Sequence, residues 1–261
     1  QGVLISGLTG TVFPYGGNGN ATSNVAFAVN FGQSPFVYTP PTGFKALNTQ
    51  NLPDSLIVKG STAFNISLDT GANIKTSTEA LFGTSYLEWI KDRATANNHQ
   101  LIDTVRGTSA VLQSNTTAAE TTYTAPSGNS VGWAWKKGAT QGFDIVTYTG
   151  TGVATTVAHS LGVAPKMIIA KSRSSGTAGW PVYHASIGAA NYLALNTTAA
   201  SAAGAVWNST TPTSSVFSVG ATGNGINDSG ATYVAYLFAE VAGFSKFGSY
   251  TGNGSADGPF V

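Results

Sequence analysis

A repeated segment limits the possible folds of this chain more than any other feature of its sequence. A strand-like opening begins at Phe64, recurs at Phe143 and starts a third time at Phe244. In the first two copies the sequence Asn-Thr-Thr-Ala-Ala follows, at 115–119 and at 196–200. Repetition at this spacing indicates tandem duplication of one small structural unit. The first two copies should therefore fold alike.

The repeated segments have the residue pattern of β-strands. Aromatic and β-branched residues alternate with small or polar ones, as in 143–148 and 232–238, and clusters of Gly, Asn, Ser or Pro separate the runs. Two stretches, 78–93 and 189–206, could instead be helical, although 88–91 is better interpreted as a strand because it aligns with a strand of the next copy. We therefore predict an all-β chain of tandem β-sandwich modules.

The repeat also predicts the domain boundaries. We expect 1–53 to supply terminal strands of one sandwich, 54–142 the first repeat unit, 143–243 the second, and 244–261 the start of a truncated third. Strands at both ends then lack partners, and an open strand edge tends to pair with another chain. We therefore expect a longer polypeptide or neighbouring subunits to complete the ends, and a homo-oligomer to form, with a trimer as the first expectation.

Composition excludes several classes of function. Only 9% of the residues are charged, against about 25% in an average globular domain, and the net charge is +1. Nucleic acid and anionic lipid therefore exert no strong electrostatic attraction on the chain. No apolar run approaches the roughly 20 residues of a membrane span, so we expect no membrane insertion. The chain has no cysteine, which excludes disulfides, thiolate metal sites and thiol catalysis.

Two sets of motifs resemble known phage proteins. The segment VNFGQSPFVYTPPTGFKALNTQNLP at 29–53 resembles the C-terminal end of SPRY-type, concanavalin-like β-sandwich domains. The repeat motifs, including WIKDR at 89–93 and YTGNG at 250–254, resemble modules that follow such domains in tail-fibre-like phage proteins. The resemblance implies concanavalin-like or jelly-roll-like sandwiches at the virion surface, outside the cell. It transfers no catalytic or binding residues to this chain.

Residues suited to catalysis or metal binding form no convincing constellation. No pair of histidines has the spacing of metal ligands, and no G-x-S-x-G nucleophile motif occurs. The histidines are His99, His159 and His184. Glu88, Asp92 and Asp103 are near one another in sequence, but the second copy has no acids at the aligned positions, which favours surface or turn roles. We predict no enzyme activity, no catalytic residue, no metal and no cofactor.

Four residues are candidates for contact with a glycan. Trp180 and Trp207 lie beside turn residues, and an exposed indole ring packs well against the apolar face of a sugar. Lys171 and Arg173 recur as Lys91 and Arg93 in the first copy, and such a basic strand end would suit an anionic polysaccharide. The alternative is structural: tryptophans in the core, and basic side chains on a solvent-facing strand or in ion pairs with Asp92 or Asp103. Trp133 and Trp135 are expected on the core face.

Seven Asn-X-Ser/Thr sequences are potential glycosylation sites, and a phage origin would leave them unmodified. They begin at Asn20, Asn65, Asn115, Asn196, Asn208, Asn227 and Asn253.

The predicted function follows mainly from the resemblance. We expect a structural virion protein, a tail-fibre-like surface module that contacts host surface polysaccharide and binds other virion proteins. One alternative is an extracellular adhesin or filament subunit of a bacterium or archaeon. Another is a carbohydrate-active enzyme, which the eleven Asp and Glu residues leave open.

Overall fold

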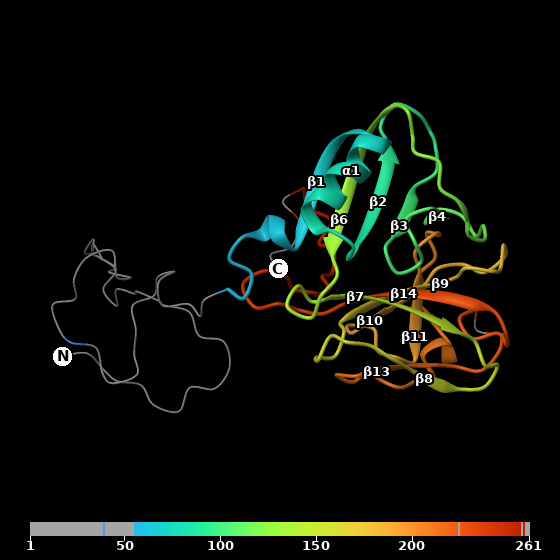
Figure 1. The fold of residues 1–261 in the computed structure, drawn as a ribbon. Helices are drawn as coiled ribbons and strands as arrows, with labels where there is room; N and C mark the ends of the chain where they lie inside the picture. Colours follow the sequence, from blue (N-terminus) through green and yellow to red (C-terminus); the bar gives the residue numbers. More distant parts are fainter. Residues whose placement is uncertain (1–38, 40–54, 224, 257, 259–261) are drawn as a thin grey trace. The chain divides into compact units, whose positions relative to one another are not determined.

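The computed structural model describes Thr39 and residues 55–223, 225–256 and 258. The chain divides into two compact units, 1–53 and 54–261. The strands predicted within 1–53 lie outside the described residues. Antiparallel strands dominate the described part of the second unit, which contains a single α-helix (Figure 1). The prediction of an all-β, sandwich-like fold is therefore confirmed.

The elements of the first copy occupy residues 60–136. They are the 3-10 helix η2 (Gly60–Thr62), β1 (Phe64–Thr70), α1 (Gly71–Phe82), β2 (Tyr86–Asp92), β3 (Gln100–Asp103), β4 (Ala110–Gln113), β5 (Thr121–Thr122) and β6 (Asn129–Lys136). The second copy spans 143–238. Its elements are β7 (Phe143–Thr149), β8 (Thr155–Ala158), β9 (Met167–Ser172), β10 (Pro181–His184), β11 (Asn191–Ala194), β12 (Ala202–Ala203), the 3-10 helix η3 (Ala205–Trp207), β13 (Val216–Val219) and β14 (Thr232–Phe238).

Each copy forms one six-stranded sheet, and the two sheets have the same strand order. The first sheet runs β1-β6-β2-β3-β4-β5, and the second, read from its β7 edge, runs β7-β14-β9-β10-β11-β12. Phe64 pairs with Trp135 in the first sheet, and Phe143 pairs with Phe238 in the second. The register thus places the two repeated openings at equivalent edges, as their sequence alignment predicts.

The two sheets pack against each other through equivalent faces. In Figure 1 the strands of the first sheet run up the view, whereas β7 and β14 run across it. Leu87, Leu101 and Leu112 of the first sheet are buried there against residues of the second. We call this cluster the central core; its other buried members are Phe143, Ile145, Ile169, Trp180, Val182, Val234, Tyr236 and Phe238. One sandwich is therefore shared between the copies.

Different elements cover the outer faces of the two sheets. Helix α1 covers the first sheet, with Ile74 buried against Ile90 and Ile102. It begins where the Thr70 hydroxyl accepts a hydrogen bond from the Asn73 backbone N–H (3.4 Å) and ends before Gly83, whose φ of 66° favours glycine. The sequence had suggested a helix at 78–93, but 86–92 is strand β2, as the repeat alignment favoured.

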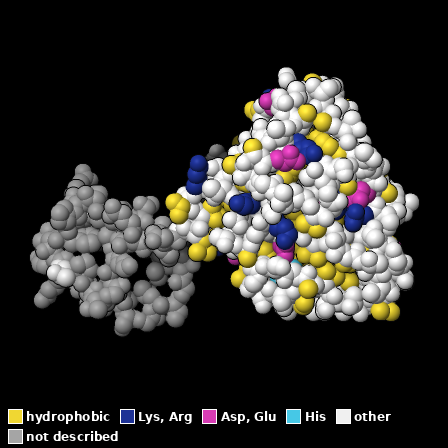
Figure 2. Space-filling model, in the orientation of Figure 1, with side chains coloured by type: hydrophobic (Ala, Val, Ile, Leu, Met, Phe, Trp, Pro, Cys, Tyr) yellow, Lys and Arg dark blue, Asp and Glu magenta, His cyan; other side chains and the backbone are white. Residues whose placement is uncertain are grey.

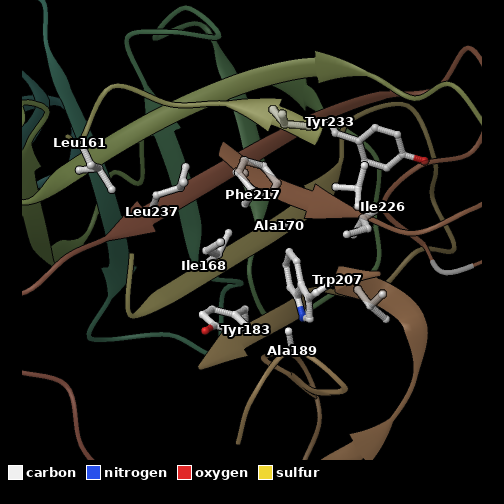
Figure 3. Close-up of a cluster of buried hydrophobic side chains, with 14 of the residues drawn as sticks. Leu161, Ile168, Ala170, Tyr183, Ala189, Trp207, Phe217, Ile226, Tyr233 and Leu237 are labelled. Carbon is white, nitrogen blue, oxygen red and sulfur yellow. The ribbon is translucent and has the colours of Figure 1, made fainter. Parts of the chain in front are cut away.

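In the second copy a two-stranded sheet, β8 with β13, takes the place of the helix. Phe217 from β13, Ile168 from β9 and Leu237 from β14 meet in an outer core (Figure 3). The helix considered for 189–206 is not present, because this stretch contains β11 and β12 and ends in η3. Helix α1, the first sheet, the second sheet and the β8–β13 pair thus form four layers in succession.

Candidate functional site

The two tryptophans proposed for glycan stacking are buried. Trp180 has no exposed surface, and its indole Nε1 donates hydrogen bonds to the carbonyls of Gln113 (3.1 Å) and Thr116 (3.0 Å) in the first copy. Trp207 is buried in the outer core with its ring edge-on to Tyr183 (Figure 3). The glycan-stacking hypothesis is therefore wrong for both rings, and the alternative of tryptophans in the core is confirmed. Turn residues beside them do open to solvent, but long-range packing covers the rings themselves.

The two basic candidates are also used inside the fold. The Lys171 side chain is fully buried, and its Nζ donates to the carbonyls of Thr117 (3.0 Å), Ala178 (3.0 Å) and Ser175 (3.3 Å). Burial lowers the pKa of Lys171 to about 8. Because the ammonium is enclosed by carbonyl groups, it is not presented to an anionic ligand. The alternative of a solvent-facing lysine is equally wrong.

Arg173 belongs to an ion-pair network that joins the copies. Its Nη2 lies 2.8 Å from Glu120 Oε1, and Arg106 Nη1 lies 2.8 Å from Glu120 Oε2. Arg106 also binds Asp103 through Nε, and the Tyr236 hydroxyl donates to Asp103 Oδ2 (2.9 Å). Partial burial opposes ionisation of Glu120, but hydrogen bonds from Arg173 and Arg106 outweigh it and lower the pKa of this carboxyl.

These contacts connect loops of the first copy to strands of the second. We name as the inter-copy clamp the residues Asp103, Arg106, Glu120, Lys171, Arg173, Trp180 and Tyr236. Sequence reasoning missed Arg106, Glu120 and Tyr236, and no motif in the sequence identifies Glu120 as the common partner of Arg106 and Arg173. The clamp holds the two sheets together and leaves little of its polar chemistry open to a ligand.

The repeated Asn-Thr-Thr motif has a structural role in both copies. Asn115 Oδ1 accepts a hydrogen bond from the His99 backbone N–H, and Asn196 Oδ1 accepts one from the Trp180 backbone N–H, each at 3.0 Å. These asparagines therefore fix the same turn against the same neighbouring strand in each copy. The repetition of the motif is explained by this turn and does not require a ligand.

The carboxylates and histidines considered for catalysis mostly hold turns. Asp92 accepts hydrogen bonds from the backbone N–H groups of Ala94 (2.8 Å) and Thr95 (3.2 Å). Asp103 and His184 end equivalent strands of the two copies and hold the turns that follow. Asp103 Oδ1 accepts a hydrogen bond from the Arg106 backbone N–H (2.8 Å), and His184 Nδ1 accepts one from the Ser186 backbone N–H (3.2 Å). Among the described residues, no group of three or more His, Asp or Glu side chains could hold a metal ion.

Glu88 is a candidate carboxylate for which the predicted surface or turn role is wrong. It lies on β2 beneath α1 with no exposed surface, and one carboxylate oxygen accepts a hydrogen bond from Thr78 Oγ1 (2.7 Å). Burial, opposed by the Thr78 hydrogen bond, raises the pKa of Glu88 to about 7. The helix covers this carboxylate, so its raised pKa affects stability rather than chemistry on an external substrate.

An aromatic cleft opens at one end of the central core. Two adjoining hollows, of about 330 Å³ and about 270 Å³, share the side chains of Trp135, Phe238 and Phe247. Phe64 lies 5.1 Å from Trp135 between ring centroids, and Phe143 lies 4.8 Å from Phe238, so equivalent aromatic pairs line the cleft. No charged side chain lines either hollow. The cleft suits apolar contact and not acid–base catalysis.

The face of the first sheet continues beyond this cleft as an apolar surface. Ile66 and Leu68 on β1 are 54% and 65% exposed, and their β6 partners Trp133 and Val131 are partly exposed. We call these four residues the open strip. Trp133 was expected on the core face; it does lie on the face that packs against the second sheet, but that sheet leaves it half-covered.

The described residues contain no helix long and apolar enough to cross a membrane. Two duplicated antiparallel sheets with a shared core define an all-β protein built from an internal repeat. The model of a domain of unknown function, DUF7483, matches twice, at residues 59–138 and 124–261. The chain belongs to this family. Neither a search of curated proteins nor one of solved structures found a match.

Proposed function

We propose that this chain is a structural, non-enzymatic module of a tail-fibre-like protein on the surface of a phage particle. Its partners would be other virion proteins, further copies of itself and polysaccharide on the host surface. The resemblance of 29–53 to the end of a SPRY-type domain, and of the repeat motifs to phage modules, supports the assignment to a virion.

The observation that carries the structural role is the inter-copy clamp. Groups that perform chemistry in enzymes, such as the Lys171 ammonium, the Arg106 guanidinium and the Asp103 carboxylate, are committed here to holding two copies together. Breaking a buried ion pair is strongly destabilising, so these groups resist separation of the sheets. Such use of polar side chains supports a module whose role is to keep its shape.

The surface composition supports the same role. Figure 2 shows scattered Lys, Arg, Asp and Glu side chains on a face made mostly of uncharged polar groups and backbone. Because few charges are present, changes in salt concentration should alter the interactions of this surface little. A protein displayed outside the cell meets such changes.

The proposed glycan contact needs different residues from those expected. Trp180, Trp207 and Lys171 are buried, so stacking on a sugar falls to a partly exposed ring of the first sheet outside the open strip, such as Trp89. Indole rings in this setting can pack on apolar sugar faces. The fibre role does not depend on which ring makes this contact.

The origin of the particles that contain this protein tests the proposal. Phage particles and cell-surface filaments from a culture encoding the chain would be separated by density-gradient centrifugation and probed with an antibody to residues 55–256. We expect the protein in the phage band, with immunogold labels on fibres. Recovery only with cell-surface filaments would favour the adhesin, and hydrolysis of host polysaccharide by the purified chain would favour the enzyme.

A further inference from the structure

We propose that the open strip is a docking surface for a second copy of this chain. Ile66, Leu68, Val131 and Trp133 would pack against the same strip of a neighbouring chain. This docking rests on the part of the proposed function that makes the protein a homo-oligomer, and it identifies the surface through which neighbouring chains meet.

The two copies within the chain differ in how far the equivalent face is covered. The register makes Ile66, Val131 and Trp133 equivalent to Ile145, Val234 and Tyr236. The second-copy residues are at most 3% exposed, because the first sheet covers them. Their equivalents in the first copy remain partly exposed, and Ile66 is 54% exposed. The same face is therefore covered in one copy and partly uncovered in the other.

The two copies also differ in the residue at the next position along their edge strands. Leu68 pairs with Val131, and Thr147 pairs with Val234, so positions 68 and 147 are equivalent. Both side chains are exposed. In the second copy the exposed position carries a polar threonine, whereas the first copy carries a leucine that is 65% exposed. Leu68 lies beside Ile66, Trp133 and Val131, so it extends a contiguous apolar patch, and such a patch marks an interaction site.

The open strip is continuous with the central core between the two sheets, which favours a second chain of this protein as its occupant. On β6, Trp133 of the strip is two residues from Trp135, which packs against the central core. The strip therefore continues the sheet face through which the two internal copies of one chain already pack together. The four side chains of the strip are uncharged. The neighbouring Lys91, which pairs with Val131, turns its Nζ to the carbonyls of Asp92 (2.6 Å) and Thr95 (2.9 Å), so its charge is held at the end of β2. Equivalent faces meet within one chain, and a self-complementary contact of this kind is common at symmetry axes between chains.

Sedimentation velocity of the full chain at increasing concentration tests the docking. We expect concentration-dependent oligomers, dimers if the strips meet at a twofold axis and trimers if they meet at a threefold axis. Leu68→Thr introduces the residue that the second copy tolerates at this position and should weaken association about tenfold. Leu68→Lys should weaken it about 100-fold, because like charges would face each other.

Val153→Thr is the matched control, because Val153 is also 65% exposed but lies in a turn of the second copy. It should leave association unchanged, and thermal unfolding should show that each variant is folded. A monomer at all concentrations would overturn the docking. Oligomers that tolerate Leu68→Lys would also overturn it. Neither result affects copurification with particles, which tests the fibre role separately.

Discussion

At the scale of single residues, Glu88 should make stability depend on pH. The folded-state pKa, about 7, is above the ordinary value of 4.5, so the protonated carboxyl favours the folded state. This stabilisation is complete below pH 4.5 and is lost as pH rises through about 7, with a total of about 3 kcal/mol. In urea unfolding between pH 4 and 8, Glu88→Gln should remove this loss.

Glu240→Gln is the control for the pH experiment, because Glu240 is exposed and distant in sequence from the helix that covers Glu88. This variant should keep the wild-type dependence on pH. If Glu88→Gln also kept it, the pKa of Glu88 would not be raised in the folded protein, and another titrating group would cause the loss of stability.

Trp180 should contribute to stability and not to glycan binding. Replacing it with alanine removes a fully buried ring and leaves the carbonyls of Gln113 and Thr116 without their indole donor, so we expect a loss of about 3–5 kcal/mol. Chemical denaturation measures this loss. A stable Trp180→Ala variant with weaker binding to host polysaccharide would contradict the buried position.

The site shows why burial at single residues was only partly predictable. The neighbours of Trp180 in sequence are turn residues, which suggests an exposed ring. Its indole instead donates to carbonyls more than sixty positions earlier in the chain. Lys171 meets Thr117 in the same way, at a sequence separation of 54. No local pattern encodes such contacts. The turn roles of Asp92 and Asp103 were predictable, because comparison of the copies showed that the acids are not retained at equivalent turns.

At the scale of elements, the contact of α1 with β6 depends on Gly132. A Cβ atom at this position would lie 2.4 Å from Ile74 Cγ2, so Gly132→Ala should push the helix from the sheet and cost about 1–3 kcal/mol in unfolding free energy. Ala235 occupies the equivalent position in the second copy, where the β8–β13 pair lies and no helix does. Gly248→Ala, with no atom within 4 Å of the new Cβ, should cost much less.

The repeat alignment could predict the strands that the two copies share but not helix α1. The equivalence of the two sheets was predictable from the repeat, because aligned segments such as 64–70 and 143–149 occupy equivalent edges. Helix α1 occurs where the copies differ most, so the alignment could not predict it. Its start was also hidden, since Thr70-Gly71 ends a strand in the repeated pattern and only here begins a helix.

At the scale of the whole molecule, the two copies should unfold together. The central core and the inter-copy clamp both need residues from each copy, so neither sheet keeps its buried face alone. Native-state hydrogen exchange should therefore give similar opening free energies for β6 and β14, the second strand of each sheet. Calorimetry should show one transition for residues 54–261. Separate transitions for the two copies would mean that the shared core contributes little.

The environment of Asn227 has a consequence for where this protein can be made. Its side-chain nitrogen is fully buried and donates to the carbonyls of Val153 (2.7 Å) and Gly220 (2.6 Å), although Asn227-Asp228-Ser229 is a glycosylation sequence. Oligosaccharide attached to this nitrogen during synthesis, before folding, would have no space in the finished structure. Secretion from a eukaryotic cell should therefore yield little native protein, and Asn227 would have to stay unmodified for the second copy to close.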